Sequence, residues 1–155
     1  HTFFVGKPTD RIIVLTHFGK GLTTSIDKVL SKTKVGKAFL KLDEGDQPLK
    51  IIQIPEEDSA LALLTGNGFL NIIGTKSVKE LFAGGRGIKL IGLRQGDYVK
   101  TACLVGESGL EFEASTNKGQ KKVFKLNRNK LLEFIGKRSQ KGKRVNRRLV
   151  IQSMK

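Results

Sequence analysis

A six-residue stretch, Gly84-Gly85-Arg86-Gly87-Ile88-Lys89, combines three glycines with two cations. Glycine has no Cβ, so its backbone can turn tightly and approach a partner closely. Cations and bare backbone N–H groups beside such a turn suit an anionic ligand. An isolated copy is more often an ordinary β-turn with solvated charges. The stretch therefore indicates an anion site only if the chain repeats it.

The residues that usually carry catalysis do not form a set. His1 and His17 have no Cys or carboxylate at metal-ligand spacing. Tyr98 follows a Gly-Asp turn, so we expect it to pack at a strand edge. Cys103 lies alone in an apolar run, which predicts a small buried thiol and a reducing, cytoplasmic setting. No Gly-Lys pair fits a phosphate-binding loop. We expect no catalytic residue, no metal and no cofactor in this chain.

The net charge of +15 over 155 residues is the clearest global signal. The charge is uneven, with +4 in residues 1–50, +1 in residues 51–105 and +10 in residues 106–155. Such an excess attracts polyanions at long range. No apolar run approaches the ~20 residues of a membrane helix, and no long basic amphipathic helix is evident. Nucleic acid is therefore the expected partner, in preference to a membrane surface.

The hydrophobic pattern is mostly that of β-strands in a chain long enough for one core. The expected strands cover residues 11–16, 37–42, 49–54, 60–65, 69–73, 88–91, 99–105, 110–114, 123–126 and 149–151. Strict alternation over 110–114 predicts one buried and one solvated face. Helix is scarce: one capped turn from Ser77 to Glu80, and one or two turns over 127–135.

Three sets of anchors repeat along the chain. Residues 14–19 recur as 63–68, and Glu44-Gly45-Asp46 recurs as Gln95-Gly96-Asp97. Leu30, Leu81 and Leu132 follow the same period. Between the anchors lies a basic or glycine-rich segment each time, at 31–37, 84–89 and 136–144. A period of about 50 residues with about four short strands is the size of a propeller blade.

These repeats predict an all-β, propeller-like fold of about three blades, each roughly four-stranded, in an incomplete ring. The approximate repeats are 1–48, 49–98 and 99–155. The run 85–90 followed by Gly96-Asp97-Tyr98-Val99 resembles the blade signature of the C-terminal domain of bacterial type IIA topoisomerase A subunits. The resemblance covers essentially the whole chain and implies a β-pinwheel.

The resemblance also implies a function. The basic outer rim of such a pinwheel binds and bends duplex DNA without sequence preference, and presents DNA segments to the catalytic core for ATP-dependent relaxation or decatenation. The DNA-cleaving tyrosine, ATP and Mg²⁺ would belong to other domains of the parent enzyme. Its partners would be a second A subunit and the ATPase B subunit, in the cytoplasm at the nucleoid.

Topoisomerase IV is favoured over gyrase. Gyrase carries a box of Gln-basic-basic-Gly-Gly-basic-Gly, and residues 81–87 here read Leu-Phe-Ala-Gly-Gly-Arg-Gly. The glycines are present, but the Gln and both leading cations are absent. The third repeat also looks like the last blade of a topoisomerase IV A subunit. The alternatives are a DNA-wrapping gyrase domain and, less favoured, an RNA-binding β protein.

The predicted DNA contacts are cations in and around the repeated segments. They would neutralise phosphates and release counterions, with little reading of bases. Seven cations fall within residues 137–148, so the third repeat is expected to carry most of the contact. The predicted residues are Lys20, Lys34, Lys37, Arg86, Lys89, Lys118, Lys121, Lys122, Lys137, Arg138, Lys141, Lys143, Arg144, Arg147 and Arg148.

Overall fold

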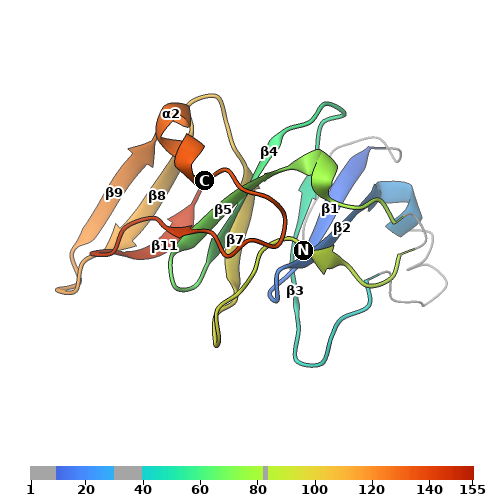
Figure 1. Cartoon of the computed structure of the whole chain (residues 1–155), viewed down its shortest axis with the longest axis horizontal. Coiled ribbons are helices and arrows are strands. Elements are labelled where there is room, and N and C mark those ends of the chain that lie inside the picture. The colour runs from blue at the N-terminus through green and yellow to red at the C-terminus, as the bar shows by residue number, and fades with distance from the viewer. Residues whose placement is uncertain (1–9, 30–39, 82–83) are drawn as a thin grey trace.

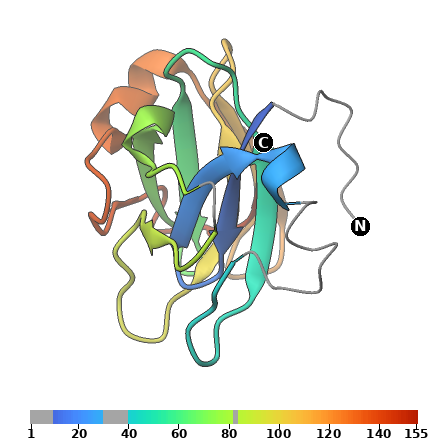
Figure 2. The same ribbon diagram turned by 90° about the vertical axis from the view of Figure 1, so that its right-hand side faces the viewer.

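The computed structural model describes residues 10–29, 40–81 and 84–155, which form three antiparallel sheets standing face to face (Figures 1 and 2). Sheet 1 has the order β3 (Pro48–Gln53), β1 (Arg11–Thr16), β2 (Lys20–Ser25), β6 (Ile88–Lys89). Sheet 2 has the order β7 (Val99–Leu104), β4 (Ala60–Thr65), β5 (Phe69–Gly74), β10 (Lys143–Arg144). Sheet 3 has the order β11 (Val150–Met154), β8 (Leu110–Ser115), β9 (Lys121–Leu126).

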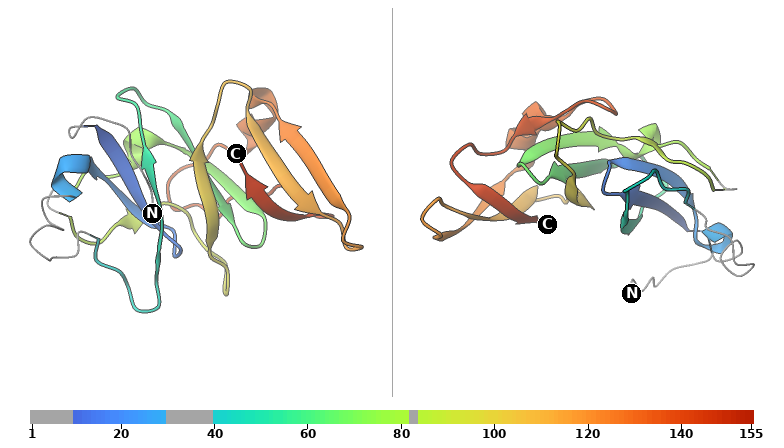
Figure 3. Two further views of the ribbon diagram at one scale, coloured as in Figure 1. Left: turned by 180° about the vertical axis from the view of Figure 1, so that it is seen from behind. Right: turned by 90° about the horizontal axis from the view of Figure 1, so that it is seen from below.

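Seen from below, the sheets follow one another along a shallow, open arc (Figure 3). Residues 26–29 form a helical turn after β2, and the 3-10 helix η1 (Thr75–Ser77) follows β5. After β9 come α2 (Arg128–Leu131) and η2 (Leu132–Phe134). Blade-like antiparallel sheets in an arc confirm the predicted all-β pinwheel.

The same hairpin is found in every sheet. Thr16 and Thr65 end its first strand in sheets 1 and 2, and Thr116 directly follows that strand in sheet 3. Each hydroxyl oxygen accepts the backbone N–H found four residues later. Gly19 and Gly68 close the first two turns with positive φ, 80° and 87°, which glycine adopts without strain. The predicted repeat of 14–19 at 63–68 is therefore a repeated hairpin.

The Gly-Asp repeat fastens this hairpin. The Asp46 carboxylate accepts the N–H of Phe18 at 2.9 Å, and the Asp97 carboxylate accepts the N–H of Asn67 at 3.1 Å. Each aspartate thus satisfies a donor in the hairpin turn of its own sheet. The segment that precedes β11 reads Asn146-Arg147-Arg148-Leu149 and contains no carboxylate. Sheet 3 therefore has two arginines in the segment where sheets 1 and 2 have the aspartate that binds the hairpin turn.

Each fourth strand comes from further along the chain. β6 pairs with β2, and β10 pairs with β5, both antiparallel and both only two residues long. A Cβ on Gly87 would lie 2.6 Å from the backbone nitrogen of Gly21, and one on Gly142 would lie 2.6 Å from the carbonyl oxygen of Leu70. Only glycine allows the crossing chain to approach the preceding sheet so closely.

Two apolar cores hold the sheets together. Residues such as Leu15 and Leu63 fill the space between sheets 1 and 2. Leu64, Leu70 and Phe112 belong to the core between sheets 2 and 3. These side chains are almost fully buried, so truncating one to alanine is expected to cost about 2–5 kcal/mol. The packing of the three sheets against one another therefore fixes the positions of the exposed loops.

Several expected elements differ in the structure. Residues 40–42 form no strand, only a bridge from Leu40 to Gly85, because Gly85 approaches from the next repeat. The capped turn at Ser77–Glu80 is wrong: the 3-10 helix ends at Ser77, whose hydroxyl donates to the Gly74 carbonyl. Leu132 is 60% exposed, and its neighbours Leu131 and Phe134 are buried instead. Leu30 and segment 31–37 lie outside the described residues.

Candidate nucleic-acid interface

The first rim, on sheet 1, consists of Lys20, Asp43, Arg86 and Lys89. Lys20 forms an ion pair with Asp43, and the Arg86 guanidinium lies 3.8 Å from the same carboxylate. The hydrogen bond from Lys20, with the nearby charges of Lys20 and Arg86, holds the pKa of Asp43 below its ordinary value of 3.8. Asp43 is therefore ionised at neutral pH, and it offsets part of the positive charge of this rim.

The second rim, on sheet 2, consists of Phe69, Arg94, Lys141, Lys143 and Arg144, and it has a different chemistry. The Arg94 guanidinium carbon lies 3.6 Å from the centre of the Phe69 ring, and that of Arg144 lies 4.8 Å from it. Arg94 also donates to the Lys141 carbonyl at 3.1 Å. Stacking on an aromatic face orients a guanidinium without neutralising it. Among the described residues, neither arginine forms a salt bridge with a carboxylate.

A groove of about 720 Å³ opens beside the second rim. Four cations and one acid, Glu133, line it together with Phe69 and Gly142. The cations are Arg94, Lys143, Arg144 and Arg147. This local excess of positive charge favours a phosphate-bearing ligand.

The segment between η2 and β10 crosses from sheet 3 back over sheet 2 (Figure 1). The N–H of Ser139 donates to Leu90, the N–H of Gly92 donates to Gln140, and the Arg138 guanidinium donates to the Lys89 carbonyl at 2.8 Å. Ser139 has a left-handed φ of 71°, which an L-residue adopts only when neighbours hold it there. The crossing segment is therefore fixed in place.

The path of this segment corrects the predicted position of the basic residues 137–148, which were expected on the third sheet. Lys137, Arg138, Lys141, Lys143 and Arg144 belong to the third repeat in sequence, but they lie beside sheet 2, because β10 completes that sheet. In the same way, Arg86 and Lys89 come from the second repeat and lie on sheet 1. These two basic segments thus lie on the sheet that precedes their own repeat.

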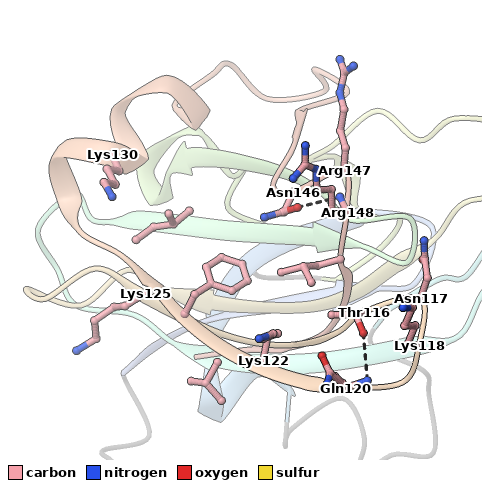
Figure 4. A pocket seen from close by; sticks show the side chains of 14 residues that line it. Thr116, Asn117, Lys118, Gln120, Lys122, Lys125, Lys130, Asn146, Arg147 and Arg148 are labelled. Atoms are coloured by element: carbon pink, nitrogen blue, oxygen red, sulfur yellow. Dashed lines mark hydrogen bonds between the residues drawn. The ribbon is translucent and has the colours of Figure 1, made fainter.

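A third basic surface lies beside β9, and Figure 4 shows the side chains that line it. The β9 groove, of about 900 Å³, is lined by Phe124, Leu126, Leu149 and several cations. Its cations are Lys118, Lys122, Lys125, Lys130, Arg147 and Arg148, and none of the described residues that line it is acidic. Arg147 lines both this groove and the groove of the second rim, which makes the basic surface continuous.

The predicted contact residues therefore divide into three groups. Lys20, Arg86 and Lys89 lie on the first rim, and the first two face Asp43. The crossing segment and the β9 side carry the exposed remainder: Lys118, Lys121, Lys122, Lys137, Arg138, Lys141, Lys143, Arg144, Arg147 and Arg148. Lys34 and Lys37 lie outside the described residues.

Sequence reasoning missed Arg94, Lys125 and Lys130. Arg94 stands three residues before Asp97, as Asp43 stands three residues before Asp46. In both turns the carbonyl of the first residue accepts the N–H of the aspartate at 3.0 Å. Aligning the two turns position by position shows that an acid on the first rim is replaced by an arginine on the second. That signal is visible in the sequence.

Tyr98 and Cys103, the other reactive side chains considered from the sequence, are packed against neighbouring residues. Tyr98 is 45% exposed, and its ring lies over Gly66, where a Cβ would come within 2.6 Å of it. Burial raises the pKa of the half-buried Cys103 thiol above its ordinary value of 9.0. Within 10–29, 40–81 and 84–155, no three His, Cys, Asp or Glu side chains gather to hold a metal. In the same ranges, no helix is long and apolar enough to cross a membrane.

No protein-family model and no curated protein sequence matches the chain. Solved structures do match its fold. The E. coli ParC C-terminal domain aligns with a TM-score of 0.80 at 16% identity, over 97% of this chain and 61% of that one. The C-terminal domain of DNA topoisomerase IV aligns with a TM-score of 0.70 at 15% identity, over 96% of this chain and 46% of that one.

The DNA gyrase A C-terminal domain aligns with a TM-score of 0.68 at 19% identity, over 94% of this chain and 50% of that one. The chain thus has the fold of the C-terminal domains of topoisomerase IV and gyrase A, and it spans about half the length of these structures. Both kinds of domain share the fold, so the fold does not choose between them.

Proposed function

We propose that this chain is a duplex-DNA-binding module from the C-terminal region of a type IIA topoisomerase A subunit. The observation that carries the proposal is the second rim, where cations are held in place on the sheet and, among the described residues, none of them forms a salt bridge with a carboxylate. This rim lies on a fold shared with topoisomerase IV and gyrase A domains. Basic surfaces of this kind bind the phosphate backbone through counterion release.

The mechanism follows from how the cations are held. Arg94 stacks on Phe69 and is tied to the Lys141 carbonyl, so little side-chain entropy is lost when it meets a phosphate. Lys143 and Arg144 extend from a strand that is paired to β5. Fixed cations along an arc would guide the duplex along a curved path and offset the roughly 1–6 kcal/mol that bending 20–30 bp costs.

Within the parent enzyme, the bound and bent segment would be presented to the catalytic core for strand passage. We favour topoisomerase IV, because residues 81–87 lack the Gln and leading cations of the gyrase box. On this proposal, cleavage and ATP hydrolysis belong to other domains of a homodimeric A subunit and its ATPase partner. The chain by itself is then expected to bind DNA without cutting it.

The test is fluorescence anisotropy of the whole chain with a labelled duplex over a salt series. The binding constant should fall steeply as salt is added. The slope of its logarithm against the logarithm of the salt concentration should be about −0.9 for each neutralised phosphate. Duplexes of unrelated sequence should bind with the same affinity. Tighter binding to structured RNA than to the duplex would refute the proposal. Nicking or relaxation of plasmid by the purified chain would refute the non-catalytic role.

A further inference from the structure

The hairpin turns of sheets 1 and 2 hold their backbone donors in the same way. After the turn threonine, two consecutive N–H groups donate to the segment just before β3 or β7, a strand of the same sheet. The first N–H meets a backbone carbonyl and the second an aspartate carboxylate, at 2.8–3.1 Å. The pairs are His17 with Gln47 and Phe18 with Asp46 in sheet 1, and Gly66 with Tyr98 and Asn67 with Asp97 in sheet 2.

The sheet 3 turn, residues 116–119, has no such acceptors. Asn117 and Lys118 follow the turn threonine as the donors of the other two turns do, but neither backbone N–H donates to a described residue. The segment just before β11, residues 146–149, contains no carboxylate. In each sheet this segment precedes a strand of that same sheet, so the two free donors do not depend on a strand from another repeat.

Arginines stand where the other sheets have the acid. Asn117, Arg147 and Arg148 line the β9 groove (Figure 4) and also a smaller cavity of about 260 Å³ that the hairpin turn of sheet 2 shares. The Arg148 N–H donates to the Asn146 side chain at 2.8 Å, which holds the segment in a turn of its own. Lys118 adds an ammonium group to the groove. None of the described residues that line the groove or the cavity is acidic.

The acidic residues of this region lie elsewhere. Glu111 and Glu113 are further along β8, opposite residues 123–125 of β9, and neither lines the groove or the cavity. Glu133 lines the groove of the second rim together with Arg147, but it forms no salt bridge with a described residue. These carboxylates offset part of the charge of sheet 3, and none takes the position of the missing aspartate.

We propose that the sheet 3 turn and the segment 146–149 form a binding site for one phosphate group. One phosphate oxygen accepts the N–H groups of Asn117 and Lys118, in the place that an aspartate carboxylate takes in sheet 2. The other oxygens face the guanidinium groups of Arg147 and Arg148. Backbone N–H pairs and arginines are the usual donors to phosphate. A tetrahedral phosphate can direct oxygens at the turn and at the arginines together, which a planar carboxylate does less well.

A duplex backbone and a free phosphorylated ligand both carry this group. The site adjoins the second rim, because Arg147 lines the groove of that rim as well as the β9 groove. In the DNA-binding module proposed above, the site would hold one backbone phosphate where sheets 2 and 3 meet. That source of the phosphate rests on the proposed function, whereas the site itself does not.

The test is an amide NMR titration of the whole chain with inorganic phosphate at constant ionic strength. We expect the largest saturable shifts at Asn117 and Lys118. The Gly119 N–H closes this turn onto the Thr116 carbonyl, and Asn117 has no positive φ, so proline fits its position. Asn117→Pro removes one donor and should weaken phosphate binding roughly three- to tenfold. Asn117→Ala keeps the N–H and should bind like the unaltered chain.

A second pair of variants tests the arginines. Arg147→Ala/Arg148→Ala should weaken phosphate binding by more than about tenfold. The control Lys76→Ala/Lys79→Ala removes the same charge near the opposite end of β5 and should change binding little. Thermal unfolding checks that each variant folds. Parallel titrations use acetate, as a carboxylate, and a short duplex.

Four results would overturn the site: no shift at Asn117 and Lys118 with phosphate, equal shifts with acetate, equal affinity of Asn117→Pro and Asn117→Ala, or an equal loss in the lysine control. Phosphate shifts at this turn without duplex shifts there would support the site and assign it to a free phosphorylated ligand. Phosphate binding by a chain that binds no duplex would refute the proposed function and leave the site standing.

Discussion

The first and second rims occupy the same place on two successive sheets but carry different chemistry. Lys20 and Phe69 both follow a hairpin glycine, and they pair with Lys89 and Arg144 on the crossing strands. On the first rim, Lys20 and Arg86 face a carboxylate. On the second, arginines stack on an aromatic ring.

The difference shows how one framework gives two electrostatic surfaces. At the turn position where the first rim has Asp43, the second rim has Arg94, so a negative charge is exchanged for a positive one. At the position where the first rim has Lys20, the second rim has Phe69. Phe69 does not repel Arg94 as a lysine would, and its ring orients the Arg94 guanidinium. The backbone scaffold is shared, so the phosphate-binding capacity is expected to concentrate on the second rim.

The largest expected effect comes from reversing the charges of that rim. The triple variant Lys141→Glu/Lys143→Glu/Arg144→Glu should weaken duplex binding by more than tenfold and reduce the salt slope by about 2–3, because three phosphate contacts are lost. Anisotropy over a salt series measures both. The matched control reverses the exposed Lys28, Lys76 and Lys79, which lie near the opposite ends of β2 and β5. An equal loss in the control would show that only net charge matters.

A substitution that disturbs the pairing of β10 with sheet 2 should lower the free energy of unfolding and thereby weaken DNA binding. Gly142→Ala would place a Cβ 2.6 Å from the Leu70 carbonyl oxygen at a φ of 72°. We expect a loss of about 1–3 kcal/mol from this overlap, together with weaker DNA binding. Chemical denaturation measures the first effect. Gly106→Ala, where the nearest atom is 3.8 Å away, is the control and should be near neutral. Equal stability of both variants would contradict the close approach.

Removing the ring should have a smaller effect. Phe69→Ala leaves the net charge unchanged but releases Arg94 and Arg144, so we expect binding to weaken roughly three- to tenfold with little change in salt slope. Phe69→Tyr keeps the ring face and should bind like the unaltered chain. Wild-type affinity for Phe69→Ala, with an unchanged melting temperature, would show that stacking does not position these cations for DNA.

The smallest effect is expected on the first rim. Asp43→Asn should free Lys20 and Arg86, strengthen binding about two- to fivefold and steepen the salt slope by about 1–2. The lowered pKa of Asp43 means that its stabilising ion pair is present above pH 3.8 and is lost only as the pH falls through the lowered value. Affinity should therefore show no Asp43 titration between about pH 6 and about pH 8. Weaker binding by Asp43→Asn would contradict the masking role.

The hairpins could be predicted because they depend on local signals, and the pinwheel class could be predicted because those signals repeat about every 50 residues and carry the family resemblance. Alternating apolar residues, turn glycines and the repeated Gly-Asp pair can each be read in a short window. The pairing of β6 with β2 and of β10 with β5 was not predicted, because β6 and β10 are two residues long and their pairing depends on glycines that fit against a distant sheet. Without the pairing of β10, the basic residues 137–144 could not be placed on sheet 2. Arg94 was missed because it stands alone among apolar and polar residues.

The most direct test is an NMR titration of the whole chain with a short duplex of arbitrary sequence. If the second rim is the main DNA surface, the largest amide shifts should fall at 92–95 and 137–148. Smaller shifts are expected at 84–89, where Asp43 offsets the cations. Largest shifts at 84–89, with 137–144 unaffected, would contradict the account.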